Sequence, residues 1–320
     1  MRIAVLDDYQ GIAAGMAEWN RIPDASCSFF ANHVSDPAEL MTMLAEFDVV
    51  QMMRERTPIP GDLLRTLPKL KLLAGTGRRQ PHVDMETASK LGITVTGTGG
   101  SSDSTPELAW GLIIGLTRNL ASEDQALRKG LWQTAIGPSL SGKTLGILGM
   151  GRIGTQMAGI AAVFGMRVIA WGPTLTNERA RRSGAELVAW EELFASSDIV
   201  TIHVPLTELS HGFVTERELR LMKPGAYLIN TSRGPIVQEG ALVAALKTGS
   251  IAGAALDVYE REPLSLTDPI LSAPNTLLSP HLGYASLEGI RGFYRESVDN
   301  IESWLRGEPV NVLNEPELCA

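Results

Sequence analysis

A glycine-rich stretch near the middle of the chain constrains the fold most strongly. Residues 145–154 read Leu-Gly-Ile-Leu-Gly-Met-Gly-Arg-Ile-Gly, so Gly149, Gly151 and Gly154 have the spacing G-x-G-x-x-G. In this pattern the three glycines allow a tight turn after a strand, a close backbone approach to a pyrophosphate, and close packing of a helix on the sheet. A small-residue apolar run, 153–164, follows as a helix would. The stretch therefore predicts a dinucleotide-binding loop, with a plain strand–turn–helix as the alternative.

Strand-like and helix-like segments alternate on both sides of this loop. Apolar strand-like runs lie at 3–6, 49–52, 70–74, 93–96, 145–148, 167–171, 199–204, 226–230, 252–258 and 276–278. Helix-like stretches between them include 37–46, 60–67, 85–91 and 238–247. Such alternation is typical of parallel sheets with helices on both faces, and it predicts an α/β protein with two doubly wound domains, the second with about six strands.

The domain boundaries are predicted from breaks in these patterns. Residues 97–103 are rich in glycine and small polar residues and are the candidate linker. A capping-box pattern at Ser104 then opens an apolar helix that runs to about Leu120. A final amphipathic helix, 288–306, and a short tail, 308–313, are expected to return to the first domain. We expect a substrate domain at 1–100 plus 288–320, without a G-x-G-x-x-G loop, and a dinucleotide-binding domain at 101–287.

Composition narrows the class of protein. A length of 320 residues fits two domains, and 44% hydrophobic with 20% charged residues is typical of a globular enzyme. The net charge of -8 argues against nucleic acid as the main partner. Cys27 and Cys319 form no disulfide framework and no metal-ligand spacing, which suits a reducing compartment. No apolar run approaches the roughly 18 residues of a membrane span, so we expect a cytoplasmic protein. We also expect no metal.

Three strand ends of the second domain carry polar residues suited to carbonyl chemistry. Arg233 follows the strand 226–230, Glu262 lies five residues after Asp257, and His281 follows the strand 276–278. The carboxyl ends of parallel strands form one edge of a sheet, where ligands bind. An Arg there can hold a carboxylate and polarise the adjacent carbonyl, and a His oriented by a Glu can protonate the oxygen as hydride arrives.

Each of these residues also has a purely structural interpretation. Arg233 alone is compatible with a surface ion pair, and a lone His281 with a structural histidine. The other histidines lack a comparable setting and are interpreted as structural: His33, His82, His203 and His211.

Over nearly its full length the chain resembles the D-isomer-specific 2-hydroxyacid dehydrogenases. The matching pieces are the loop 149–154, Asn-Thr-Ser-Arg-Gly at 230–234, Ala-Leu-Asp-Val-Tyr-Glu-Arg-Glu-Pro at 255–263 and Ser-Pro-His-Leu-Gly at 279–283. The resemblance implies a Rossmann dinucleotide-binding domain and a flavodoxin-like substrate domain with a cleft between them. It also implies that Arg233 anchors the substrate carboxylate and that Glu262 and His281 form the acid–base pair.

The resemblance implies further binding residues. The expected cofactor-binding set is Gly149, Gly151, Arg152, Ile153, Gly154, Gly172, Pro205, Thr231, Ser232 and Asp257, the last of these near the nicotinamide. The expected substrate-binding set is Gly75, Thr76, Gly77 and Arg54. In the glycine stretch the main-chain N–H groups would bind the carboxylate, with a simple glycine turn as the alternative.

The sequence departs from the family pattern in two places. NAD-preferring members carry an acidic residue at the end of the second strand of the domain, whereas Gly172 stands there in this chain. NAD remains the family default, but the loss of the carboxylate leaves NADP open, with Thr174, Thr176, Asn177, Arg179 and Arg181 as candidate contacts to a 2′-phosphate. The second departure is Arg-Arg-Gln-Pro at 78–81, a more basic substrate loop than usual.

The leading hypothesis is an NAD(P)-dependent oxidoreductase that transfers a hydride between a nicotinamide cofactor and a small D-2-hydroxy acid or 2-keto acid. The alternatives are a formate- or phosphite-type dehydrogenase of the same fold and a non-enzymatic dinucleotide-sensing regulator. The resemblance also implies a homodimer, with the long helices of the cofactor domain as the interface.

Overall fold

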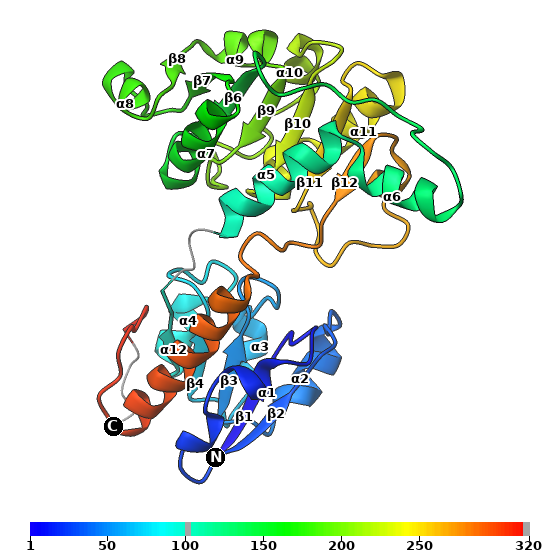
Figure 1. Cartoon of the computed structure of the whole chain (residues 1–320). Coiled ribbons are helices and arrows are strands. Elements are labelled where there is room, and N and C mark those ends of the chain that lie inside the picture. Colours follow the sequence, from blue (N-terminus) through cyan, green and yellow to red (C-terminus); the bar gives the residue numbers. More distant parts are fainter. Residues whose placement is uncertain (100–103, 316–320) are drawn as a thin grey trace. The chain divides into compact units, whose positions relative to one another are not determined.

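The computed structural model describes residues 1–99 and 104–315, which form two compact units. Unit 1 comprises residues 1–101 and 286–320, and unit 2 comprises 102–285. Each unit contains one parallel β-sheet with helices on its faces (Figure 1), so the predicted fold class is confirmed. Part of the candidate linker, residues 100–103, lies outside the described residues. Among the described helices, none is both long and apolar enough to cross a membrane.

Unit 1 has a five-stranded sheet in the order β2-β1-β3-β4-β5, which is the flavodoxin-like order. Its elements are β1 (Arg2–Val5), α1 (Ala13–Met16), η1 (Trp19–Arg21), β2 (Ser26–Phe29), α2 (Pro37–Leu44), β3 (Val49–Met52), α3 (Gly61–Arg65), β4 (Leu72–Gly75), α4 (Met85–Lys90), β5 (Thr94–Thr96) and α12 (Leu287–Leu305). Leucines of α2 and α3 pack on one face of the sheet, and α12 packs against β4 and α1.

The C-terminal tail returns to unit 1 beside β5. The N–H of Leu313 donates to the carbonyl of Val95 at 2.8 Å, and the N–H of Gly97 donates to the carbonyl of Asn311 at 3.0 Å. The Asn314 side chain accepts a hydrogen bond from the N–H of Val95 at 2.8 Å. The tail thus lies along the edge strand β5 of the unit 1 sheet.

Unit 2 has a seven-stranded parallel sheet in the order β12-β11-β10-β9-β6-β7-β8. Its elements are α5 (Ser104–Thr117), α6 (Leu120–Arg128), β6 (Thr144–Leu148), α7 (Arg152–Val163), β7 (Arg167–Trp171), α8 (Asn177–Arg182), β8 (Glu186–Leu187), α9 (Trp190–Ser196), β9 (Ile199–Ile202), α10 (Glu216–Leu221), β10 (Tyr227–Asn230), η2 (Gly234–Ile236), α11 (Glu239–Thr248), β11 (Gly253–Leu256), η3 (Pro269–Ser272) and β12 (Thr276–Leu278). This is the Rossmann order, extended at one edge by β12.

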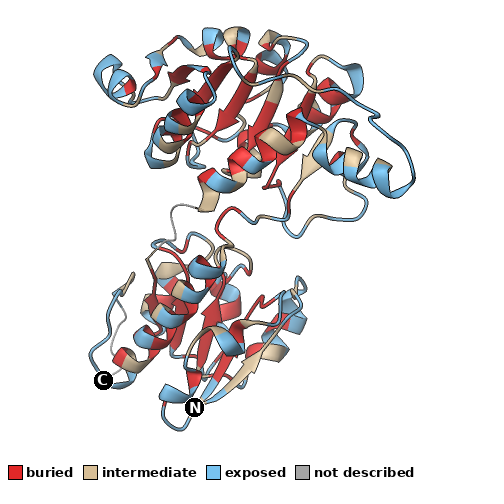
Figure 2. Ribbon diagram, in the orientation of Figure 1, coloured by how far each residue is buried: buried red, intermediate tan, exposed pale blue. Residues whose placement is uncertain are grey.

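Apolar side chains cover both faces of the unit 2 sheet. One core cluster joins the strands to α5 and α7, and another joins them to α9, α10 and α11. Most strands of both sheets are accordingly buried, whereas β2, β8 and β12 are partly exposed (Figure 2). Because both faces are covered, the strands read as continuous apolar runs in the sequence.

The structure differs from the sequence prediction in three elements. The strand β2 was not predicted, because its Ser-Cys-Ser-Phe sequence is half-exposed at the sheet edge. The sheet of unit 2 has seven strands rather than about six, since β8 is a two-residue edge strand. The helix expected to run to Leu120 ends at Thr117, and α6 begins after Asn119, whose φ of 55° breaks the helix.

Candidate functional site

The G-x-G-x-x-G stretch at 149–154, called here the fingerprint loop, joins β6 to α7. Its glycines have different packing roles. Gly149 has a φ of 101°, and a Cβ there would lie 2.7 Å from the carbonyl carbon of His203. A Cβ on Gly154 would lie 2.3 Å from the carbonyl oxygen of Gly149. At Gly151 a Cβ would meet nothing within 4 Å. Two glycines are thus required by packing, and the third leaves open space at the N-terminus of α7, where a pyrophosphate fits.

Residues after β9 and β10 lie at the same edge of the sheet as this loop. The Ser232 hydroxyl donates to the carbonyl of Val204 at 2.5 Å, which joins the two strand ends. The Thr231 hydroxyl is buried and has no hydrogen-bond partner within the described residues. A buried hydroxyl without a partner is costly, so its position suits a contact to a bound molecule. The loop and this hydroxyl therefore fit a dinucleotide.

Arg233 is positioned by a tight turn after β10. The Asn230 side chain accepts from the N–H of Ser232 at 3.0 Å and donates to the carbonyl of Arg233 at 2.9 Å. The guanidinium donates to the carbonyl of Ser232 at 2.7 Å. A Cβ on Gly234 would lie 2.0 Å from the carbonyl carbon of Tyr259, so this position requires glycine. The Asn-Thr-Ser-Arg-Gly sequence thus fixes the arginine through its backbone.

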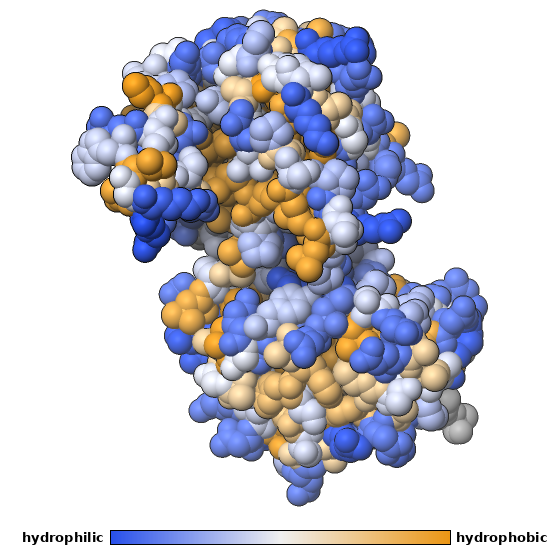
Figure 3. All heavy atoms as spheres, turned by 90° about the vertical axis from the view of Figure 1, so that its right-hand side faces the viewer, coloured by the Kyte–Doolittle hydropathy of each residue, from blue (hydrophilic) through white to orange (hydrophobic). Residues whose placement is uncertain are grey.

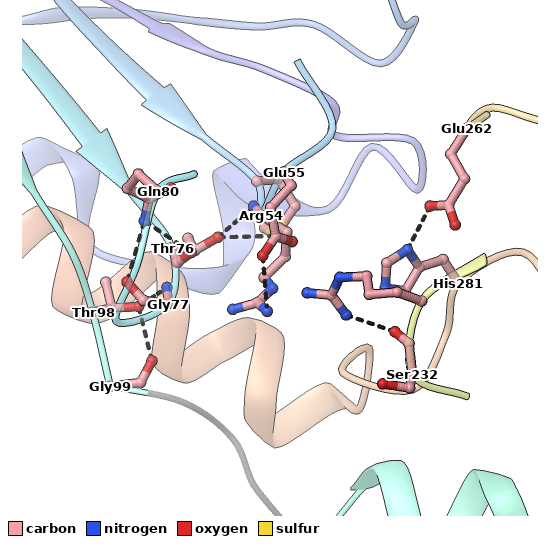
Figure 4. A network of polar contacts seen from close by, with 12 residues as sticks. Arg54, Glu55, Thr76, Gly77, Gln80, Thr98, Gly99, Ser232, Glu262 and His281 are labelled. Carbon is pink, nitrogen blue, oxygen red and sulfur yellow. Dashed lines mark hydrogen bonds and ion pairs between the residues drawn. The ribbon is translucent and has the colours of Figure 1, made fainter. Parts of the chain in front are cut away.

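Glu262 and His281 form a direct pair. His281 Nδ1 lies 2.5 Å from Glu262 Oε2 (Figure 4), and Glu262 Oε1 accepts from the N–H of Tyr259 at 2.9 Å. His281 has a φ of 54°, a backbone conformation that is uncommon for a non-glycine residue and is typical of functional sites. The carboxylate is held by a main-chain amide and in turn orients the imidazole, which is the arrangement of a general acid–base group.

Asp257 holds the loop that carries His281. It is fully buried and accepts three hydrogen bonds, from the Ser279 hydroxyl at 2.6 Å, from the N–H of Leu282 at 2.7 Å and from the N–H of Gly283 at 2.8 Å. Burial raises the pKa of the Asp257 carboxyl, while these hydrogen bonds and His281 favour its charged form. Its contacts give Asp257 a structural role, and a direct contact to the cofactor stays a prediction.

Other contacts to this loop were missed by sequence reasoning. The hydroxyls of Ser104 and Thr105 both donate to the carbonyl of Gly283 at 2.8 Å, so the start of α5 is tied to the loop. The Tyr259 hydroxyl donates to the carbonyl of Ser279 at 2.9 Å. The capping-box pattern at Ser104 was interpreted as a local helix signal, and nothing in the sequence indicates its distant partner.

Among the predicted substrate residues of unit 1, Gly75 ends β4, Thr76 and Gly77 follow it, and Arg54 follows β3. Figure 4 shows Arg54, Thr76 and Gly77. Arg54 has a φ of 56°, and its N–H donates to the Thr76 hydroxyl at 2.7 Å. Arg54 Nη2 lies 3.5 Å from Glu55 Oε1. A Cβ on Gly77, whose φ is 92°, would lie 2.0 Å from Arg54 Nη1. The guanidinium of Arg54 therefore rests against the backbone of the glycine loop, and Gly77 is needed for both space and conformation.

The N–H groups of this glycine loop are not arranged as the sequence analysis expects. The N–H of Thr76 donates to the carbonyl of Met52 at 3.1 Å, and the N–H of Gly77 donates to the Thr98 hydroxyl at 2.8 Å. Both amides are thus occupied, so the expected nest of available amides is wrong for these two residues. A Cβ on Gly75 would meet the amide group of Gln80 at 2.3 Å, which gives this glycine a packing role.

Sequence reasoning missed Gln80 and Thr98. Gln80 is buried, and its Nε2 donates at 3.2 Å to the carbonyls of Thr76 and Gly77, while its Oε1 has no partner within the described residues. The available signal for Gln80 was the unusual Arg-Arg-Gln-Pro stretch, whereas Thr98 carried none.

Comparisons with known proteins show the family of the chain. The family model described as D-isomer specific 2-hydroxyacid dehydrogenase, NAD binding domain, matches residues 110–283. The glyoxylate reductase of Thermococcus litoralis is 40% identical over 270 residues, which is 81% of each chain. The solved phosphoglycerate oxidoreductase of Vibrio cholerae O395 is 36% identical, with a TM-score of 0.91 over 96% of this chain and 99% of that one.

A further structural relative was solved with a cofactor. An acyclic imino acid reductase in complex with NADPH and D-Arg is 28% identical, with a TM-score of 0.76 over 98% of this chain and 100% of that one.

Proposed function

Because this chain belongs to the D-isomer specific 2-hydroxyacid dehydrogenase family and is an NAD(P)-dependent oxidoreductase of 2-hydroxy acids, we propose that Arg233, Glu262 and His281 carry its reaction. The reaction is hydride transfer between the nicotinamide and a small D-2-hydroxy acid or the matching 2-keto acid. The observation that supports this most is the 2.5 Å contact between His281 Nδ1 and Glu262 Oε2, on a loop at the carboxyl edge of the sheet.

The residues divide the chemical work in the direction of reduction. Arg233 binds the substrate carboxylate and polarises the adjacent keto group. The bound cofactor supplies the hydride. His281, held at Nδ1 by Glu262, delivers a proton from Nε2 to the carbonyl oxygen. In the direction of oxidation the same nitrogen accepts the proton.

Unit 2 is proposed to hold the cofactor, and unit 1 to contribute further substrate-binding residues. The cofactor-binding residues are Gly149, Gly151, Arg152, Ile153, Gly154, Gly172, Pro205, Thr231, Ser232 and Asp257. In unit 1 Arg54 is proposed to bind the substrate, and Gly75, Thr76 and Gly77 form the loop against which its guanidinium rests. The open space at Gly151 and the unpartnered Thr231 hydroxyl support the first group, and the guanidinium of Arg54 supports the second.

The proposed assembly is a homodimer formed through unit 2. The segment from α6 to residue 136 exposes apolar side chains: Leu120, Leu127, Leu131, Trp132 and Ile136. Trp132 is 77% exposed and Ile136 is 99% exposed. Exposed apolar groups at this density favour burial against a second copy. Figure 3 shows hydrophobic side chains at the surface of unit 2 on the side where α6 lies in Figure 1.

A keto-acid panel tests the proposed function. The oxidation of NADH and of NADPH is followed with glyoxylate, hydroxypyruvate, pyruvate and bulkier 2-keto acids, with formate and phosphite tested in the reverse direction. We expect turnover with at least one small 2-keto acid. The absence of turnover with every keto acid, or turnover with formate or phosphite alone, would contradict the proposal, since neither of those two reactions includes a keto oxygen for His281 to protonate.

A further inference from the structure

The end of β7 is where a Rossmann domain contacts the adenosine ribose of its cofactor. A carboxylate about 20 residues after the first fingerprint glycine accepts hydrogen bonds from the ribose hydroxyls and repels a 2′-phosphate. In this chain Gly172 occupies that place, followed by Pro-Thr-Leu-Thr. The first acidic residue after it, Glu178, forms an ion pair with Arg182 on α8. The carboxylate that selects NAD is therefore missing.

Gly172 lies against the fingerprint loop. A Cβ built on it would be 3.9 Å from the backbone nitrogen of Met150 and 4.0 Å from the Cα of Gly149. Its nearest neighbour would be the Cβ of Leu175 at 3.4 Å, an ordinary contact distance. The position thus borders the phosphate-binding loop, is half-buried, and accepts a larger side chain without strain.

A cationic side chain, that of Arg179, contacts both the turn after β7 and the fingerprint loop. The Arg179 guanidinium donates through Nη1 to the carbonyl of Thr174 at 2.9 Å and through Nη2 to the carbonyl of Met150 at 3.4 Å. It thereby spans the turn after β7 and the fingerprint loop. Across the described residues, no carboxylate forms an ion pair with Arg179, unlike Arg182 in the same helix. The two carbonyls orient the Arg179 guanidinium but, being neutral, do not balance its positive charge.

We propose that this chain selects NADP(H) over NAD(H), with Arg179 binding the 2′-phosphate in the space left by Gly172. The inference rests on the proposed function, because it takes the fingerprint loop to be the dinucleotide site. A guanidinium matches phosphate geometry with paired N–H donors, and Arg179 has donors beyond the two that the carbonyls use. Thr174 is exposed in the turn after β7, and its hydroxyl is a further candidate contact to the phosphate.

The test measures binding rather than turnover. The full chain is titrated with NADPH and NADH by nicotinamide fluorescence, and with adenosine 2′,5′-bisphosphate and ADP by calorimetry. A charge-assisted contact to the phosphate is expected to make NADPH bind about ten- to hundredfold more tightly than NADH. Arg179→Ala should remove most of this preference and leave the NADH dissociation constant unchanged. Arg182→Ala, which changes an exposed arginine of the same helix, serves as the matched control and should keep the preference.

A second variant keeps the test decisive if Arg179→Ala disturbs α8. Gly172→Asp places a carboxylate at the end of β7 and should reverse the preference toward NADH. Equal or tighter binding of NADH by the wild-type chain would overturn the inference, as would an equal loss of both cofactors in Arg179→Ala with a native circular dichroism spectrum.

The two proposals fail separately. A chain that prefers NADPH in these titrations but reduces no keto acid keeps this inference and loses the proposed function. A chain that binds and uses NADH as well as NADPH loses the inference and keeps the function.

Discussion

Two carboxylates near the proposed reaction centre have different tasks. Glu262 contacts His281 directly, whereas Asp257 contacts the loop that carries it. Removing the charge of Glu262 leaves the loop intact. Removing the charge of Asp257 takes away the hydrogen bonds that hold the loop of His281. Substitutions at the two positions should therefore be distinguishable by whether stability changes along with activity.

Glu262→Gln tests the orienting role of the carboxylate. The amide has nearly the same shape but no negative charge to hold a protonated imidazole. We expect kcat to fall by about 10²-fold, within the range of general acid–base effects, with an unchanged thermal midpoint. Steady-state kinetics with the best keto acid, together with a melting curve, measures this. Wild-type turnover in the variant would exclude Glu262 from the acid–base pair.

Asp257→Asn tests the support of the loop. The amide nitrogen of asparagine would face one of the three donors that the carboxylate now accepts from. We expect a loss of about 1–3 kcal/mol in the free energy of unfolding, because buried donors lose their acceptor, and a fall in kcat. Urea unfolding measures the first effect, with Asp124→Asn on exposed α6 as the control. A variant as stable as the wild type would mean that these hydrogen bonds do not hold the loop.

At the scale of elements, the turns after β10 and β11 are packed against each other. Gly234 follows β10, and the backbone of Tyr259, which follows β11, fills the space where its side chain would be. The position of Arg233 thus depends on a backbone contact between two turns that are 25 residues apart in sequence. A larger residue at position 234 should therefore displace the neighbouring Arg233.

Gly234→Ala is predicted to impair substrate binding and stability together. Its Cβ would lie 2.0 Å from a carbonyl carbon, so one turn must move, at a cost of about 1–3 kcal/mol, as in other overpacked sites. We expect a raised KM for the keto acid. Gly240→Ala on α11, where a Cβ meets nothing within 4 Å, is the matched control. Equal behaviour of the two variants in unfolding and kinetics would contradict the argument.

The sequence was informative for elements whose signals are local. The fingerprint loop, the buried strands and the residues directly after them have patterns that repeat with known spacing, and these define the polar edge of the unit 2 sheet. The strand β2 was missed because a half-exposed edge strand has no apolar run. The ties from Ser104 and Thr105 to Gly283 were missed because their partners lie 179 and 178 residues away. The amides of the unit 1 loop were misjudged for a similar reason, since Thr98 reaches Gly77 from the segment after β5.

At the scale of the whole molecule, low pH should reduce the free energy of unfolding through His203, whose backbone packs against Gly149 of the fingerprint loop. Burial lowers the pKa of His203 to about 3, from about 6.5 in an unfolded chain. As pH falls below the unfolded value, the unfolded chain binds a proton that the folded chain does not, so stability is lost progressively toward pH 3. His203→Gln lacks this titration. Urea midpoints measured from pH 7.5 to 5 should fall more steeply for the wild type, and parallel curves would contradict the argument.

The association of two copies is the other property of the whole molecule. Trp132→Ser combined with Ile136→Ser removes the two most exposed apolar side chains of the α6–136 segment. We expect the wild-type chain to sediment as a dimer and the double variant as a monomer, since apolar burial drives association. Leu209→Ser and Leu266→Ser, at positions 84% and 95% exposed elsewhere in unit 2, are the controls. A monomeric wild type would refute the dimer.

The acid–base role of His281 is tested most directly by His281→Ala, assayed for turnover and for cofactor binding in the same preparation. Turnover with the best keto acid should fall by about 10²- to 10⁴-fold, because the proton donor is lost, while the dissociation constant of the nicotinamide cofactor stays nearly the same. Unchanged turnover, or a parallel loss of cofactor binding, would contradict the assignment of His281 as the group that moves the proton.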